Sequence, residues 1–172
     1  IKIACVGRLS NVVKGQNLLI SAVAELGEAN VELSLAGAGG DEGKQRAQVA
    51  ELGLGDRVKF LGQVADIRQL WSTHHMLARA SHSEGTPLAM VEAMLLGRPA
   101  LVTDVGGCAD WVTEGEHGWV AREVTHAEML AGLRRALAAR ERWPEMGRDA
   151  RARALDLFDR DAGGTLVRIA RE

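Results

Sequence analysis

Short apolar runs alternate along the chain with segments in which apolar residues recur every three or four positions. The runs predict strands at residues 1–6, 31–36, 58–61, 76–80, 100–103 and 118–120. The other segments predict helices at 16–26, 41–52, 66–71, 87–96 and 108–113, and a helical tail from residue 126 onward. Strands that alternate with helices are typical of a parallel sheet covered on both faces. We therefore predict an α/β fold, a Rossmann-like doubly wound parallel sheet of about six strands.

The loops that carry the chain's polar chemistry all follow predicted strands. They lie at residues 7–15, 37–40, 62–64, 81–87 and 104–107. In a parallel sheet these loops share one edge, and ligands bind there near the topological switch point. We expect a ligand site at this edge.

One helix start within this edge suits an anion. Thr86 is expected to cap the helix, with Pro87 at its first position, and Gly97 to end it. From 87 to 96 the helix is apolar on all sides except for Glu92, which predicts a buried helix. The free amides of its first turn would attract phosphate.

Two carboxylates bracket this helix start. Glu84 precedes it, and Glu92 shares a face with Leu88 one turn further in. A buried carboxylate needs hydrogen-bond donors, which ribose hydroxyls would supply. We infer a nucleotide with its phosphate at the helix end and a sugar beside Glu84. The alternative is an ordinary helix start, with Glu84 solvated and Glu92 paired with an arginine.

Two cations follow the first strand. Arg8 and Lys14 would face the helix start across the ligand edge and clamp a diphosphate, stabilising charge on a departing phosphate. The alternative is a solvated loop with two surface cations.

The glycines after the second strand only partly match a dinucleotide fingerprint. Gly37 and Gly39 have Glu42 where a third glycine is required, and no acidic partner follows about twenty residues later. These glycines indicate either close approach of a ligand or a tight turn. The broken fingerprint argues against a nicotinamide-dependent oxidoreductase.

Composition excludes several other classes. The 172 residues, 47% of them hydrophobic, suffice for one globular domain, and a formal charge of −2 offers no footprint for nucleic acid. No apolar run approaches the ~20 residues of a membrane span.

The cysteines and histidines show no metal-binding pattern. Cys5 and Cys108 predict reduced thiols and a cytoplasmic protein. His74, His75 and His82 lack metal-ligand spacing, so no metal site is expected. Because the chain begins directly in a strand without Met, we expect a domain of a longer protein.

Several motifs, in this order, resemble the C-terminal, donor-binding domain of GT-B glycosyltransferases, specifically the retaining family 4 (group 1) enzymes. The resemblance covers almost the whole chain. It is carried by Val6-Gly7-Arg8-Leu9, Lys14-Gly15, Leu35-Ala36-Gly37-Ala38-Gly39, Val58-Lys59-Phe60-Leu61-Gly62, Ser81-His82-Ser83-Glu84-Gly85-Thr86-Pro87, Glu92-Ala93-Met94, Gly97-Arg98-Pro99 and Thr103-Asp104-Val105-Gly106-Gly107. Departures are Ala80, where the family often has Pro, and Asp110, where it usually has Glu.

The resemblance implies a donor site for a nucleotide-diphosphate sugar such as a UDP- or GDP-sugar, with no metal or other cofactor. Its expected catalytic residues are Arg8 and Lys14 at the diphosphate and Glu84 at the transferred sugar. Glu92 would bind the ribose and the loop at Val64 the base. The remaining donor-binding positions are expected to be Gly7, Gly37, Gly39, Gly85, Thr86, Pro87 and Leu88.

The resemblance further implies transfer with retention, in which the departing phosphate helps to deprotonate the acceptor. Residues 1–172 would form a single nucleotide-sugar-binding domain, the C-terminal half of a GT-B enzyme. The N-terminal domain, which would bind an acceptor glycan or lipid, is not in this sequence, so the isolated domain is not expected to catalyse transfer. The full-length enzyme would be cytoplasmic, at the membrane surface. Alternatives are a sugar-nucleotide epimerase of the same fold and a non-catalytic nucleotide-binding or assembly module.

Overall fold

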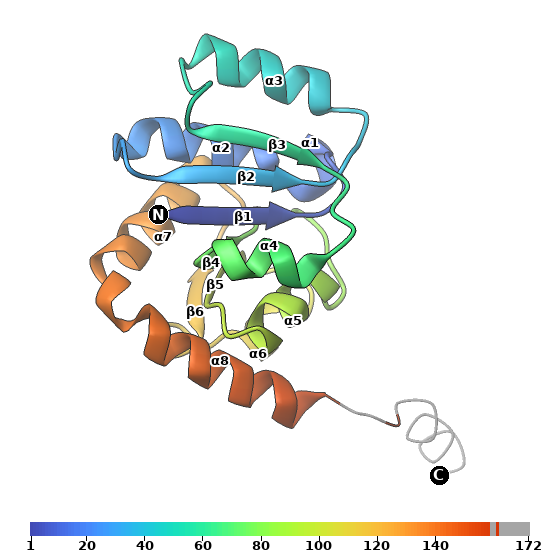
Figure 1. Ribbon diagram of the computed structural model, residues 1–172, viewed down its shortest axis with the longest axis vertical. Coiled ribbons are helices and arrows are strands. Elements are labelled where there is room, and N and C mark those ends of the chain that lie inside the picture. Colours follow the sequence, from blue (N-terminus) through green and yellow to red (C-terminus); the bar gives the residue numbers. More distant parts are fainter. Residues whose placement is uncertain (159–160, 162–172) are drawn as a thin grey trace.

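A six-stranded parallel sheet forms the centre of the protein and confirms the predicted doubly wound architecture (Figure 1). The computed structural model describes residues 1–158 and 161; the rest of the predicted helical tail lies outside the described residues. The strands are β1 (Lys2–Val6), β2 (Glu32–Ala36), β3 (Val58–Gly62), β4 (Met76–Ala78), β5 (Ala100–Thr103) and β6 (Gly118–Ala121).

The order of the strands across the sheet is β3-β2-β1-β4-β5-β6. Ile3 of β1 lies opposite Leu33 of β2 on one side and opposite Met76 of β4 on the other. The chain therefore builds outward from β1 to β3 and then returns to add β4 on the far side of β1. The topological switch point lies between β1 and β4, and ligands of doubly wound sheets bind beside the loops that follow these two strands.

Helices cover both faces of the sheet (Figure 1). α2, α3 and α7 lie on one face, whereas α4, α5, α6 and most of α8 lie on the other. Their bounds are α1 (Asn11–Lys14), α2 (Gln16–Leu26), α3 (Glu42–Glu51), α4 (Ile67–Thr73), α5 (Leu88–Leu95), α6 (Cys108–Trp111), α7 (His126–Ala138) and α8 (Trp143–Leu157), with a 3₁₀ turn at Arg140–Arg142. Within the described residues, none of these helices combines the length and the apolarity that crossing a bilayer requires.

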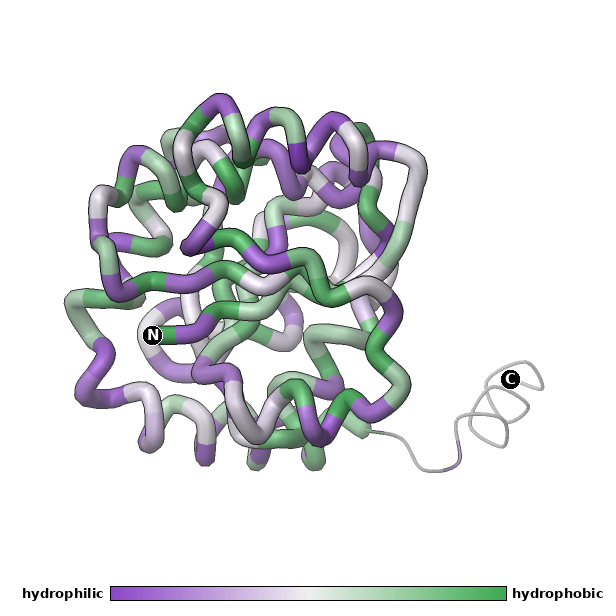
Figure 2. The backbone as a smooth tube through the Cα atoms, turned by 45° about the horizontal axis from the view of Figure 1, so that its top comes forward, coloured by the Kyte–Doolittle hydropathy of each residue, from purple (hydrophilic) through white to green (hydrophobic). Residues whose placement is uncertain are grey.

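Two apolar clusters fill the spaces between the sheet and its helix layers. Along β1, Ile3 and Cys5 belong to the cluster under α2 and α7, while Ala4 belongs to the cluster under α4 and α5. Because the central strands are buried on both faces, their sequences are continuous apolar runs rather than alternating ones. In Figure 2 hydrophilic positions recur along the outer helices, while the strands carry hydrophobic stretches interrupted by single hydrophilic positions.

The helix starts follow local capping chemistry, with one difference from the prediction. Asp66 caps α4, because its side chain accepts hydrogen bonds from the backbone N–H groups of Arg68 (2.9 Å) and Gln69 (3.2 Å). The expected Thr86 cap of α5 is wrong by one residue. Pro87 has φ −68° and ψ 114°, which is extended backbone, so Pro87 is the N-cap and Leu88 the first helical residue.

The prediction that α5 is buried on all sides is also wrong. Met90, Val91, Ala93 and Met94 face the sheet and are buried, but Leu88 is 76% exposed and Glu92 is half-buried. An apolar segment gives no periodicity from which the outward face could be read. The outward stripe of α5 begins with Leu88 and includes Glu92, one turn later.

His74 is a structural histidine between α4 and β4. Its Nδ1 is 2.8 Å from the Leu70 carbonyl oxygen, to which it must donate, so Nε2 accepts from the Ser34 hydroxyl at 2.8 Å. Burial lowers the pKa of His74, and the hydrogen bond to Leu70 only partly opposes this shift. The neutral imidazole is therefore the form that fits the folded chain.

We expect His74 to make the protein less stable in mild acid. Because its pKa is lower in the folded chain than in the unfolded chain, its stabilising effect is complete above the unfolded value of about 6.5 and is lost as the pH falls below it. His74→Gln should flatten the fall in the free energy of unfolding between about pH 7 and pH 5, measured by urea titration. His75→Gln, which alters the exposed neighbour, is the control. An unchanged slope in His74→Gln would contradict this account.

Candidate functional site

The loops after β1 and β4 are locked together at the switch point. Gly15 has φ +60°, and a Cβ atom added there would lie only 2.0 Å from the carbonyl oxygen of Ala80. The backbone N–H of His82 donates to the carbonyl oxygen of Val13 at 2.9 Å. Only glycine permits this approach, and it brings Lys14 beside the loop that carries Glu84.

Glu84 is the centre of a buried charge cluster. One of its carboxylate oxygens, Oε1, accepts from Lys14 Nζ at 2.8 Å, from the Ser81 hydroxyl at 2.7 Å and from the guanidinium of Arg79. The Glu84 side chain is only 7% exposed, so these donors replace water almost completely. Among the described residues, none donates to its second oxygen, Oε2.

The cluster holds Glu84 in its ionised form. Burial raises the pKa of Glu84, but the hydrogen bonds from Lys14 and Ser81 and the positive charge of Arg79 outweigh burial, and the net shift is downward. Two cations share one carboxylate, so the cluster carries a net positive charge. Glu84, which joins these charges, lies in the loop directly before Pro87, the N-cap of α5.

A network of buried amide side chains fixes the β1 loop. Gln16, at the start of α2, donates to the carbonyl oxygen of Arg8 (2.9 Å) and accepts from the N–H of Ser10 (3.1 Å). Gln45 of α3, fully buried, donates to Gln16 (3.3 Å) and to the side chain of Asn11 (2.8 Å). The backbone that carries Arg8 and Lys14 is thus held from both α2 and α3.

Arg8 and the start of α5 present unpartnered donors at this edge. The Arg8 side chain is exposed, and within residues 1–158 and 161 it pairs with no acidic group. Pro87 accepts from the N–H groups of Met90 and Val91, which leaves those of Leu88 and Ala89 without a backbone partner in the described chain. The backbone N–H of Gly107 donates to the carbonyl oxygen of Gly85 at 2.9 Å, which fixes the loop before α5.

The glycines after β1 and β2 allow the loops that follow these two strands to pack closely against each other. A Cβ atom at Gly37 would lie 2.0 Å from the carbonyl oxygen of Gly7, and one at Gly39 would lie 2.2 Å from that of Leu9. Their φ angles of +149° at Gly7 and +141° at Gly37 also favour glycine. Close approach of one backbone loop to another therefore accounts for these glycines. The sequence alone had suggested close approach of a ligand or a tight turn.

The remaining predicted positions lie around the same edge at different depths. Glu92 is half-buried and has no ion-pair partner among the described residues, so the arginine pair considered for it is absent there. Val64, after β3, packs partly against the α4–α5 apolar cluster. Two large apolar side chains stand exposed nearby, Val12 (81%) and Leu88 (76%).

Sequence reasoning missed Arg79, Ser81 and the Gln16–Gln45 pair. Arg79 carried a usable signal, because a charged residue directly after the apolar run 76–78 of an interior strand must find a partner. Ser81 and the glutamines carried none, since uncharged polar residues are common on loops and helix surfaces. The burial of Gln16 and Gln45 follows from the packing of α2 against α3, and that of Ser81 from the fold of the loop after β4.

The cysteines and histidines of the described chain are less suited to chemistry than the charged groups around Glu84. Burial raises the pKa of both Cys5 and Cys108 to about 11, so neither thiol is a nucleophile at neutral pH. Among residues 1–158 and 161, no group of three histidine, cysteine or acidic side chains is placed to hold a metal ion. His82 is exposed beside the site, and His75 meets the backbone of Lys2.

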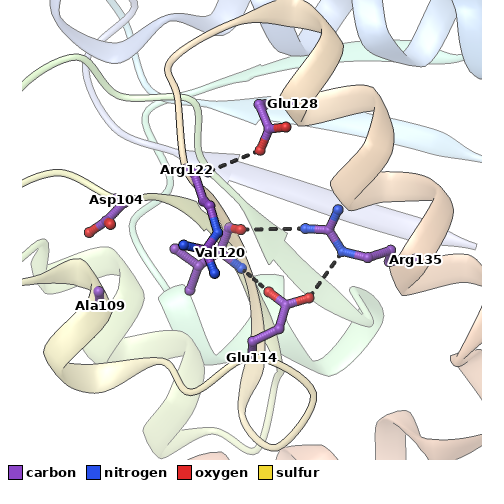
Figure 3. A pocket seen from close by; sticks show the side chains of 7 residues that line it. All are labelled: Asp104, Ala109, Glu114, Val120, Arg122, Glu128 and Arg135. Atoms are coloured by element: carbon purple, nitrogen blue, oxygen red, sulfur yellow. Dashed lines mark hydrogen bonds and ion pairs between the residues drawn. The ribbon is translucent and has the colours of Figure 1, made fainter.

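A hollow of about 470 Å³ lies at the β6 edge of the sheet (Figure 3). It is lined by Asp104, Ala109, Glu114, Val120, Arg122, Glu128 and Arg135. Glu114 pairs with Arg135 (3.0 Å) and accepts from the N–H of Val120 (2.6 Å), so these two charges compensate each other (Figure 3). It includes neither Lys14 nor Glu84, and its mixed charges indicate no particular ligand.

Comparison with known proteins identifies the family. Residues 1–139 match the family model described as glycosyl transferases group 1. D-inositol 3-phosphate glycosyltransferase of Gordonia bronchialis is 32% identical over 162 residues, which are 87% of this chain and 35% of that protein. The enzyme of the same name from Nocardia farcinica is 34% identical over 164 residues, 88% of this chain and 36% of that protein. The chain spans about a third of the length of these relatives.

Solved structures agree with this assignment. Anabaena Alr3699/HepE in complex with UDP superposes with a TM-score of 0.87 and 29% identity, covering 96% of this chain and 48% of that one. The same protein in complex with UDP-glucose gives the same TM-score, identity and coverage.

We predict that Glu84 stabilises the folded chain, whereas Glu92 does not. Glu84→Gln leaves two cations around a neutral amide, and we expect a loss of about 3 kcal/mol in the free energy of unfolding. Glu92→Gln, a matched change at a carboxylate without a partner, should alter it by less than about 0.5 kcal/mol. Urea titration of both variants measures this.

The pH dependence provides a check on the same prediction. Because the pKa of Glu84 is lowered on folding, its contribution is present above the unfolded value of roughly 4.3 and is lost as the pH falls through the folded value. The difference between wild type and Glu84→Gln should therefore shrink in strong acid. Equal stability of the two proteins at neutral pH would contradict the charge cluster described above.

Proposed function

The chain belongs to the group 1 glycosyltransferases, and from this we propose that it is the donor-binding domain of a retaining, family 4 enzyme that uses a UDP- or GDP-sugar. The observation that carries the proposal is the convergence of Lys14 and Glu84 beside the start of α5, at the switch point of the sheet. Ligands of doubly wound sheets bind in this crevice.

We place the donor diphosphate between the start of α5 and the β1 loop. The N–H groups of Leu88 and Ala89 supply donors and the positive end of the helix. Lys14 and Arg8, which has no acidic partner in the described chain, supply full charges from the opposite side. Gly85, Thr86 and Pro87 form the loop that leads into α5, and their backbone would line the diphosphate between these groups.

The nucleoside would extend from this point toward β3. Three strand spacings separate β4 from β3, roughly 14 Å, comparable to an extended nucleoside diphosphate. Val64, in the loop after β3, would then meet the base, and the loops of Gly7, Gly37 and Gly39 would lie beneath the path. Glu92 supports the ribose assignment, since it is half-buried and has no protein partner in the described chain.

Glu84 is suited to hold the transferred sugar. Its Oε1 is saturated by three donors, which fixes the carboxylate, while Oε2 has none among the described residues. A sugar hydroxyl could donate to Oε2 without disturbing the cluster. The geometry of the bound sugar would thus be set by a side chain that does not move.

For the reaction we propose retention. The bond between the anomeric carbon and the phosphate oxygen breaks, the acceptor oxygen bonds to the anomeric carbon on the same face, and the acceptor proton passes to the departing phosphate. Lys14, Arg8 and the α5 amides would stabilise the growing negative charge on the nucleoside diphosphate. In this proposal these protein groups, not a metal ion, neutralise the leaving group.

Transfer also needs a second wall for the crevice. Val12 and Leu88 expose apolar surface at its rim, where we propose that an N-terminal domain closes and presents a glycan or lipid acceptor. We treat residues 1–172 as one domain, the C-terminal half of that enzyme. The free, buried Cys5 and Cys108 support a reducing, cytoplasmic location.

The isolated domain should bind UDP or GDP through Lys14 and Glu92. Lys14→Ala removes a charge-assisted contact with the diphosphate, and Glu92→Ala removes one with the ribose, so each should raise the dissociation constant on the order of tenfold. Lys59→Ala is the matched control, because the Lys59 amine turns toward the carbonyl of Gly55 before β3, away from the site. Calorimetric titration of each variant with UDP and GDP measures these dissociation constants. No binding of either nucleotide at millimolar concentration would refute the proposal.

Transfer itself should require the full-length protein. We expect residues 1–172 alone to form no glycoside from a panel of sugar nucleotides, while the intact enzyme forms one that keeps the anomeric configuration of the donor. Proton NMR of the product reads that configuration. An inverted product would refute retention, and release of an epimerised sugar would favour an epimerase.

A further inference from the structure

Arg79 contacts Glu84 of the proposed donor site, but its side chain is too deeply buried to touch a ligand. Its backbone N–H extends the β4–β5 pairing by donating to the carbonyl oxygen of Leu101 at 2.8 Å. Its side chain is only 6% exposed. The guanidinium crosses the switch point, donating to the carbonyl oxygen of Val6 at the end of β1 and to Glu84 Oε1.

The two cations on Glu84 are held in different ways. Arg79 has a second anchor in the Val6 carbonyl and also lies 3.5 Å from the Ser81 hydroxyl. Lys14 Nζ has Glu84 as its sole partner among the described residues, and its side chain is 20% exposed. Lys14 can therefore turn outward, whereas Arg79 stays with Glu84.

We propose that Arg79 is a positioning residue that keeps Glu84 ionised and in place while Lys14 leaves it for the donor diphosphate. The inference rests on the proposed function and adds a part that neither the family match nor the sequence motifs assign. Without Arg79, the departure of Lys14 would strand a nearly buried carboxylate with only the Ser81 hydroxyl as donor. Lys14 would then remain on Glu84, and the diphosphate would lose its cation.

The number of charges in the cluster favours this exchange. With one carboxylate and two cations, the cluster still has a balanced Arg79–Glu84 pair after Lys14 moves. The fixed fork of guanidinium donors also lets Arg79 hold the Val6 carbonyl and Glu84 together, which the single ammonium of a lysine would not do. A diphosphate would thus gain Lys14 without a buried charge being left alone.

The first test is UDP affinity, measured by calorimetry on wild type, Arg79→Gln and the double variant Arg79→Gln/Glu84→Gln. Arg79→Gln should bind UDP on the order of tenfold more weakly, the loss of one charge-assisted contact. The double variant removes the carboxylate that retains Lys14 and should recover most of that loss. UDP carries no transferred sugar, so Glu84→Gln removes no proposed donor contact.

This rescue separates positioning from a purely structural role. If Arg79 only supported the fold, the second substitution would not restore affinity. Wild-type affinity in Arg79→Gln, or equal weakening in the double variant, overturns the inference. Thermal unfolding of each variant confirms that the measurements are made on folded protein.

A second test needs no nucleotide. Competitive labelling with acetic anhydride, read by mass spectrometry, reports how freely the Lys14 amine reacts, with the exposed Lys44 as internal reference. Lys14 should react several-fold more slowly in Arg79→Gln than in wild type, and faster in the double variant. An unchanged rate overturns the inference. If wild-type protein binds neither UDP nor GDP, the proposed function fails, and this labelling still decides the role of Arg79.

Discussion

The arrangement of the site depends on one shared oxygen atom, Oε1 of Glu84. It joins Lys14 from the β1 loop to Arg79 from the end of β4, the two strands that meet at the switch point. A buried carboxylate is costly without a charged partner, so the cluster favours a single relative position of the two loops. The same position brings the start of α5 to the crevice.

Elementary backbone constraints make this cluster possible. Gly15 lets the β1 loop touch Ala80, and Gly106 lets the β5 loop approach the carbonyl oxygen of Glu84, where a Cβ atom would lie 2.1 Å away. The amide network of Gln16 and Gln45 then holds the β1 loop from the helix side. Charged groups, helix amides and loop glycines thus converge because a parallel sheet places every strand end on one edge.

The strands of the sheet could be predicted from the sequence, but the buried contacts of Glu84 could not. Continuous apolar runs such as Ile3 to Val6 predict buried parallel strands to within about two residues, since both faces of the sheet are covered. The partner Lys14 could not be predicted, because it follows a different strand and its contact with Glu84 depends on loop packing. The four-residue helix Asn11–Lys14 was missed because so short a helix shows no periodicity.

The most direct measurement is a crystal structure of the domain with UDP. The account predicts the diphosphate at the start of α5 with Lys14 Nζ bound to it, while Glu84 remains on Arg79. UDP seated instead in the hollow between Asp104 and Arg135, with the Lys14–Glu84 pair intact, would contradict it.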